Sequence, residues 1–115
     1  MLALRIRIND EEPVTGGAED LGVISAGVTA VGLLGNSSYP SRPDERPDIF
    51  CQLSGATARK PGAENEHLHW VKLRFLNVGD RVVIDIVETD SASPIVDSTV
   101  HKSRNKDVIN EDTRD

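Results

Sequence analysis

The fold of this chain is decided by Phe75-Leu76-Asn77-Val78-Gly79-Asp80-Arg81-Val82-Val83-Ile84-Asp85-Ile86-Val87-Glu88. A Gly-Asp turn at 79–80 leads into a run that is rich in β-branched side chains, with Val82, Ile84 and Ile86 at alternate positions. Alternation with a period of two, directly after a turn, is typical of a strand. The stretch therefore predicts a buried strand, and it places the chain among β proteins.

Three further segments alternate in the same way, at residues 2–8, 49–53 and 67–75. The first is the most regular, and it predicts a strand with one face toward water. Leu21 to Leu34 is more ambiguous, because some of its apolar residues could also line a helix. Its three glycines at 22, 27 and 32 would each cost about 1 kcal/mol in a helix interior. We therefore expect a strand there, bent or broken at Gly27.

These patterns predict an all-β protein with one domain at residues 1–88. We expect a small, strongly bent sheet, which forms either a barrel of the Sm-like kind or a sandwich. Proline- and glycine-containing polar loops are expected at 36–47 and 55–65. Residues 89–115 carry many charges and few large apolar side chains, so they predict a flexible polar C-terminal tail.

Composition narrows the functional classes. The 115 residues carry a net charge of −6, which disfavours nucleic acid as a partner because phosphate contacts need a positive surface. A single cysteine forbids an intrachain disulfide, and charged residues at 5 and 7 interrupt any N-terminal signal sequence. The apolar run from Leu21 to Gly35 is too short and too rich in glycine to span a bilayer. We expect a cytoplasmic protein without membrane contact.

Two histidines suggest one candidate site. His67 and His69 are separated by one residue, so on a strand both imidazoles point to the same side. Such a pair could supply half of a metal site, with Cys51 or a nearby glutamate as a further ligand. The alternative is that both are ordinary strand residues beside a loop. This alternative is the main expectation, and no cofactor is predicted.

A second candidate site lies on the other side of the same segment, where Trp70, Lys72 and Arg74 alternate. An aromatic ring flanked by cations could stack on a nucleobase or bind an anionic partner. The alternative is that the single tryptophan packs in the core, with its N–H hydrogen-bonded, and that the two cations lie at the rim. We prefer this alternative because the chain has only four aromatic residues.

Catalysis finds little support in the sequence. Cys51 lies between Ile49 and Leu53 at alternate positions, which predicts a buried and inert thiol. The glycine pairs at 16–17 and 32–35 lack the spacing of phosphate-binding loops. The chain is therefore not expected to be an enzyme.

The segment Leu76-x-Val78-Gly79-Asp80-x-Val82-x-Ile84-x-Ile86 resembles a turn and strand found in many small bacterial β-domains. With several short strands in about ninety residues, the chain is similar to small barrels of the Sm-like, SH3-like or OB type. This resemblance implies a bent sheet and, for the Sm-like and OB families, binding of nucleic acid. The layout of His67-Leu68-His69-Trp70 followed by Val78-Gly79-Asp80 also resembles short bacterial proteins of unknown activity.

The leading functional hypothesis is a non-catalytic interaction module that binds a protein partner or a second copy of itself. Its basis is the number of strands, because an unpaired sheet edge is a template for strand addition. The alternatives are an Sm-like or OB-like nucleic-acid-binding domain, a metal-binding protein, and a small acidic inhibitor of another protein.

Overall fold

The computed structural model describes residues 1–39 and 47–101, which form seven strands and no helix. The predicted all-β class is confirmed. The strands are β1 (Leu2–Ile8), β2 (Val14–Gly16), β3 (Leu21–Val31), β4 (Asp48–Thr57), β5 (Asn65–Phe75), β6 (Val82–Glu88) and β7 (Asp97–His101). Within these residues there is also no helix long and apolar enough to cross a bilayer.

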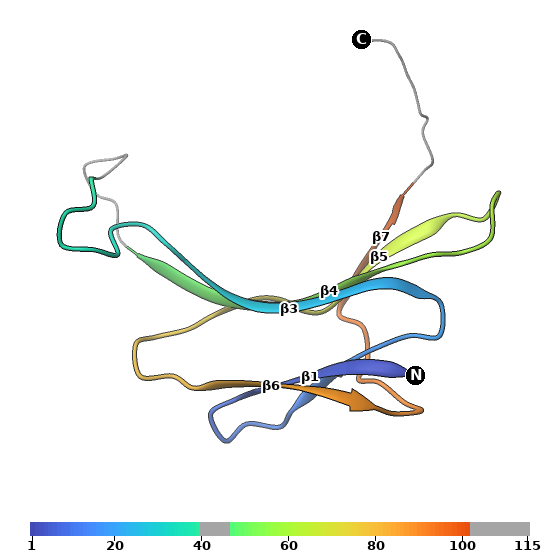
Figure 1. The fold of residues 1–115 in the computed structure, drawn as a ribbon, viewed down its shortest axis with the longest axis horizontal. Coiled ribbons are helices and arrows are strands. Elements are labelled where there is room, and N and C mark those ends of the chain that lie inside the picture. Colours follow the sequence, from blue (N-terminus) through green and yellow to red (C-terminus); the bar gives the residue numbers. More distant parts are fainter. Residues whose placement is uncertain (40–46, 102–115) are drawn as a thin grey trace, which may run out of the picture.

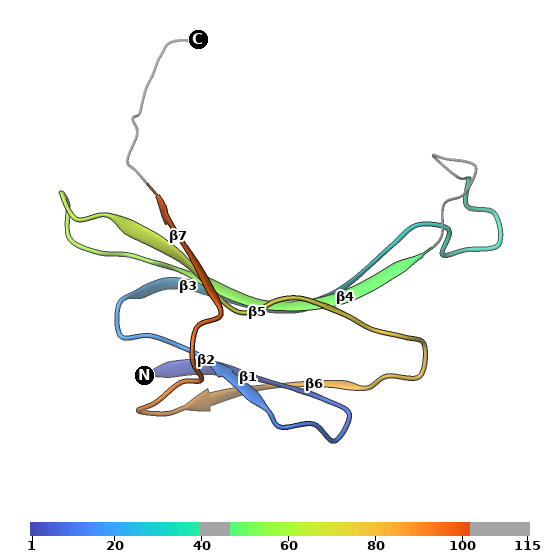
Figure 2. The ribbon, with the colours of Figure 1, turned by 180° about the vertical axis from the view of Figure 1, so that it is seen from behind.

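The strands form two antiparallel sheets that face each other (Figure 1). The smaller sheet has the order β2-β1-β6, and the larger sheet has the order β3-β4-β5-β7. The two sheets do not close into a barrel over the described residues. The larger sheet is strongly bent, and its middle lies closest to the smaller sheet while both of its ends curve away (Figures 1 and 2).

The core lies where the two sheets approach each other. β1 is the central strand of the smaller sheet, and its alternation places Ile6 and Ile8 on the inner face. Residues of β4 and β5 meet them from the larger sheet. The buried cluster consists of Ile6, Ile8, Cys51, Leu53, Leu68, Trp70 and Leu76.

The prediction that 82–88 is a buried strand is half wrong. The strand exists as β6, but Ile84 is 40% exposed and Ile86 is 77% exposed. Among the described strands β6 pairs only with β1, at the edge of the smaller sheet. Apolar alternation in this edge strand therefore does not mean burial.

The strand predicted for Leu21–Leu34 is confirmed as β3 over Leu21–Val31 but not over residues 32–34, and it is not broken at Gly27. β3 continues through Gly27 with an unbroken register against β4, and the irregularity lies at Gly22 instead. A β-bulge there brings Leu21 and Ile24 to the core side of the strand. A Cβ on Gly22 would lie 2.7 Å from the Cβ of Ala58, which explains why this position is a glycine.

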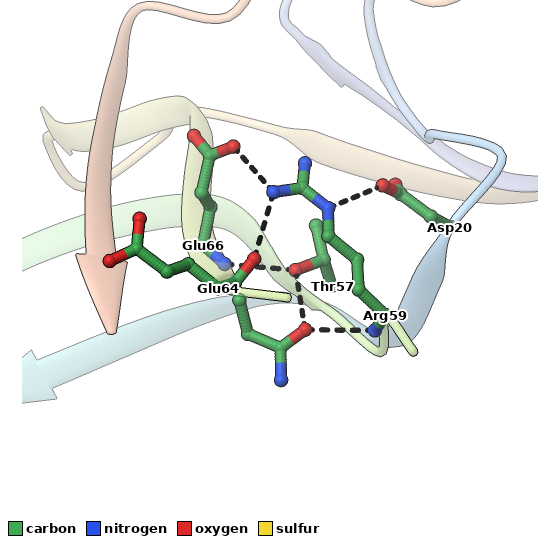
Figure 3. Close-up of polar contacts among 6 residues, drawn as sticks. Asp20, Thr57, Arg59, Glu64 and Glu66 are labelled. Atoms are coloured by element: carbon green, nitrogen blue, oxygen red, sulfur yellow. Dashed lines mark hydrogen bonds and ion pairs between the residues drawn. The ribbon is translucent and has the colours of Figure 1, made fainter. Parts of the chain in front are cut away.

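The predicted polar loop at 55–65 is shorter than expected, because β4 continues to Thr57 and β5 starts at Asn65. Arg59 fixes the turn between them (Figure 3). Its Nε donates to Asp20 at 2.8 Å, and an Nη contacts Glu66 at 2.8 Å. The turn is thereby tied to the residue that precedes β3. The other predicted loop, 36–47, lies mostly outside the described residues.

The segment that was predicted as a tail begins with ordered contacts. The backbone N–H of Ser93 donates to the carbonyl of Thr15, and β7 then pairs with residues 65–69 of β5. Figure 2 shows this part of the chain rising from the smaller sheet to the larger one. Residues 89–101 therefore contribute a strand, whereas residues 102–115 lie outside the described part. The boundary at residue 88 and the flexible tail remain predictions.

Candidate interaction surface

β5 carries all five residues that the sequence singled out. His67 and His69 lie on the outer face of the larger sheet, while Trp70 points into the core. The register of β4 against β5 shifts twice between His69 and Arg74. These shifts interrupt the simple alternation, so Lys72 and Arg74 do not repeat the environment of Trp70.

The two histidines stack on each other, which agrees with the prediction that both imidazoles point to the same side. Their ring centroids are 4.9 Å apart with an angle of 23° between the planes. In the register of β7, His67 lies opposite Thr99 and His69 lies opposite Asp97. Nδ1 of His69 is buried without a hydrogen-bond partner among the described residues. Burial lowers the pKa of His69, and the nearby His67 lowers it further.

The histidine pair does not form a recognisable metal centre. Within residues 1–39 and 47–101, no group of three or more His, Cys, Asp or Glu side chains could hold a metal ion. A structural zinc site needs four ligands, and a catalytic site needs three. Cys51, which was considered as a further ligand, is fully buried in the core, and burial raises the pKa of its thiol. The metal hypothesis remains a prediction without added support.

Trp70 is only 2% exposed and packs between the sheets. A Cβ on Gly16 of β2 would lie 2.9 Å from Cε3 of the indole ring. The expected core position is therefore observed, but the expected hydrogen bond is not, because Nε1 has no partner in the described part of the chain. A ring held in this way is not available for stacking on a base.

Lys72 and Arg74 are engaged in ion pairs. Arg74 donates to both carboxylate oxygens of Glu11 at 2.7 Å, and Lys72 pairs with Asp97. The hydrogen bond from Arg74 holds the pKa of Glu11 below its usual value, and Lys72 does the same for Asp97. The structure therefore does not bring Trp70 and the two cations together as a basic aromatic face.

These side chains instead surround a groove between β5 and the β1–β2 hairpin. Its volume is about 280 Å³. Apolar side chains from both sheets line it, and the Glu11–Arg74 ion pair lies at its rim. The lining residues are Ile6, Ile8, Glu11, Glu12, Val14, Trp70, Val71, Lys72, Leu73, Arg74 and Val96.

The backbone of β5 is open beside this groove. β7 pairs with β5 only over residues 65–69, and the last contact is the hydrogen bond from Val96 N–H to the His69 carbonyl. Beyond this point, residues 70–75 pair with β4 on one side, but no described strand pairs with them on the other. The backbone N–H and C=O groups of this segment that do not bond to β4 are left at the sheet edge.

Sequence reasoning did not find this groove or this open edge. Of the eleven lining residues, only Trp70, Lys72 and Arg74 had been candidates, and for a different role. The edge is open because the pairing of β7 with β5 ends at His69. The polar residues of β7 show no pattern from which the position of this strand in the sheet could be predicted. Comparison with protein-family models, with curated proteins and with solved structures found no match for this chain.

Proposed function

We propose that this protein is a non-catalytic interaction module that binds an extended segment of a protein partner along β5. The carrying observation is the open edge at residues 70–75, which lies beside an apolar groove. An added strand would satisfy the outward-pointing backbone groups of β5, as in other complexes formed by β-strand addition.

The groove gives such a segment a basis for selectivity. Side chains of an added strand alternate between the two faces of the sheet, so every second one would point toward the space between the sheets. There it would meet Ile6, Ile8 and Val14. A partner with apolar residues at alternate positions fits this surface best.

We take the two facing sheets as an open sandwich rather than an Sm-like barrel, because each sheet has its own free edges among the described strands. We place its action in the cytoplasm, where the single cysteine would stay reduced. Nucleic-acid binding has less support than protein binding because Trp70 is buried and both nearby cations are ion-paired.

Peptide selection tests the proposal. A library of random peptides should yield binders with alternating apolar residues, and binding should change the fluorescence of Trp70, which is the only tryptophan. Leu73 lines the groove and is 53% exposed, so Leu73→Lys should weaken binding about tenfold or more.

The matched control is Val100→Lys on β7, where Val100 is 46% exposed and is not among the residues that line the groove. Its affinity should equal that of the wild type. Failure to select any peptide, or equal affinity of the Leu73→Lys protein, would contradict the proposed function.

A further inference from the structure

β3 forms a second open edge, on the opposite side of the larger sheet. It is the first strand in the order β3-β4-β5-β7, and its 11 residues pair only with β4 among the described strands. Its sequence is Leu-Gly-Val-Ile-Ser-Ala-Gly-Val-Thr-Ala-Val, without a charged residue or a proline. In a chain with 28% charged residues, this is a long neutral edge.

The other outer strands carry the features that protect sheet edges from further pairing. β6 contains Asp85 and ends at Glu88. β7 has 5 residues and begins with Asp97. β2 has only 3 residues, and the hydrogen bonds between Thr15 and Ser93 cover it.

β3 lacks each of these protections. Val23, Val28 and Val31 are exposed, and Thr29 and Ala30 between them are exposed as well. A long, apolar and uncharged edge favours pairing with another chain. The β-bulge of β3 lies at its first residues, and the strand pairs with β4 in unbroken register from Val23 to Val31.

We infer that a second copy of this chain pairs with β3, antiparallel and about a two-fold axis near Ala26. Ala26 is the middle residue of β3, so an axis at this position lets the two copies of the strand lie side by side along their full length. It places Ser25 opposite Gly27 of the other copy, and Val23 opposite Thr29. No like charges meet, although each copy carries a net charge of −6.

The two-fold symmetry also determines the product. Each β3 edge is used up by the other, so the contact closes as a dimer and does not propagate into a fibre. We expect pairing along one strand to cover less area than the roughly 1,600 Å² of a standard interface. We therefore expect a reversible dimer whose population rises with protein concentration.

Sedimentation velocity between about 1 μM and about 1 mM tests this inference, because it covers the usual range of weak affinities. The result expected is a shift from monomer to dimer. Hydrogen exchange should also be measured at the two ends of this range. Exchange in β3 should be slower at the higher concentration than at the lower one, and exchange in β6 should be the same at both. A monomer throughout the range, or slower exchange in β6 instead of β3, would overturn the inference.

Two double variants at Ser25 and Gly27 make the test specific. Ser25 is exposed, and a Cβ on Gly27 would meet no atom of the described residues within 4 Å, so both positions tolerate larger side chains. Ser25→Lys with Gly27→Lys places like charges directly opposite each other, and it should weaken the dimer at least tenfold. Ser25→Thr with Gly27→Thr should retain it, because threonine favours strands.

The lysines reduce the net charge of −6, so loss of the dimer could not result from greater overall repulsion. Equal dimer strength of the lysine and threonine variants would contradict pairing through β3. Peptide binding at β5 should be the same in both variants, so failure of this inference and failure of the proposed function are separate results.

Discussion

Gly16 of β2 lies directly against the indole ring of Trp70 in β5, where a Cβ would approach Cε3 to 2.9 Å and Cδ2 to 3.0 Å. The same Cβ would lie 3.0 Å from Cγ of Leu53. The two sheets are thus in close contact at this point only because residue 16 has no side chain. Of these three residues, Trp70 also lines the groove in which the partner segment is proposed to bind.

Gly16→Ala should therefore destabilise the protein. Overpacking of a filled core costs about 1–3 kcal/mol, and urea denaturation would measure the change in the free energy of unfolding. Gly27→Ala is the matched control, because its Cβ meets no atom within 4 Å in the described part of the chain. The control should leave stability unchanged or raise it by up to about 1 kcal/mol. Equal stabilities of the two variants would argue against the tight contact with Trp70.

Substitutions at Trp70 separate its packing from its unpaired N–H group. Trp70→Ala should cost about 3–5 kcal/mol, since a large buried side chain is removed. Trp70→Phe should cost clearly less, because it keeps an aromatic ring and deletes Nε1, which has no partner among the described residues. Denaturation followed by circular dichroism would measure both. A Phe variant as unstable as the Ala variant would indicate that Nε1 is hydrogen-bonded in solution.

Local patterns predicted much of the fold. The alternation of residues 2–8 predicted β1 correctly. β1 pairs with β2 on one side and with β6 on the other, so one face of the strand is left toward the core and the other away from it. His67 and His69 were predicted to share a side and they stack, because this depends only on the pleat of the strand.

Long-range packing decided the rest. Ile84 and Ile86 alternate like core residues, yet their exposure depends on how far the larger sheet covers β6. The shifts in register between His69 and Arg74 also break an alternation that had suggested a shared face with Trp70. Bulges and strand order arise from contacts between distant segments, so neither can be predicted from a few consecutive residues.

The ion pairs of Arg59 should contribute to stability in a salt-dependent way. Arg59→Ala removes the contacts with Asp20 and Glu66, so we expect a lower thermal midpoint in dilute buffer. The difference from the wild type should shrink in about 1 M salt, where charges are screened within roughly 3 Å. The thermal midpoint of Arg59→Lys should lie between those of the wild type and Arg59→Ala, because lysine keeps the charge but not the forked geometry. A difference that does not depend on salt would contradict an electrostatic role.

Acidification should destabilise the protein through His69. Its pKa in the folded protein is below the ordinary value of 6.5, so the unfolded chain binds more protons between these two values. Stability from this site is thus complete above pH 6.5 and decreases as the pH falls through this window. Urea denaturation at several pH values should show the loss, and His69→Gln should reduce it.

A second variant checks the cause of this effect. His67→Gln removes a neighbouring charge that lowers the pKa of His69, so it should also reduce the loss below pH 6.5. The carboxylates of Glu11, Asp80 and Asp97 have lowered pKa values, and their contribution disappears only at pH values below their ordinary 4.5 and 3.8. An unchanged loss in both histidine variants would assign the effect to other groups.

The most direct measurement is an NMR titration of the ¹⁵N-labelled protein with a selected peptide. We expect amide shifts to change mainly at residues 70–75 and at the indole N–H of Trp70, with NOEs between the backbones of the peptide and β5. Shift changes centred on another surface, with residues 70–75 unaffected, would contradict it.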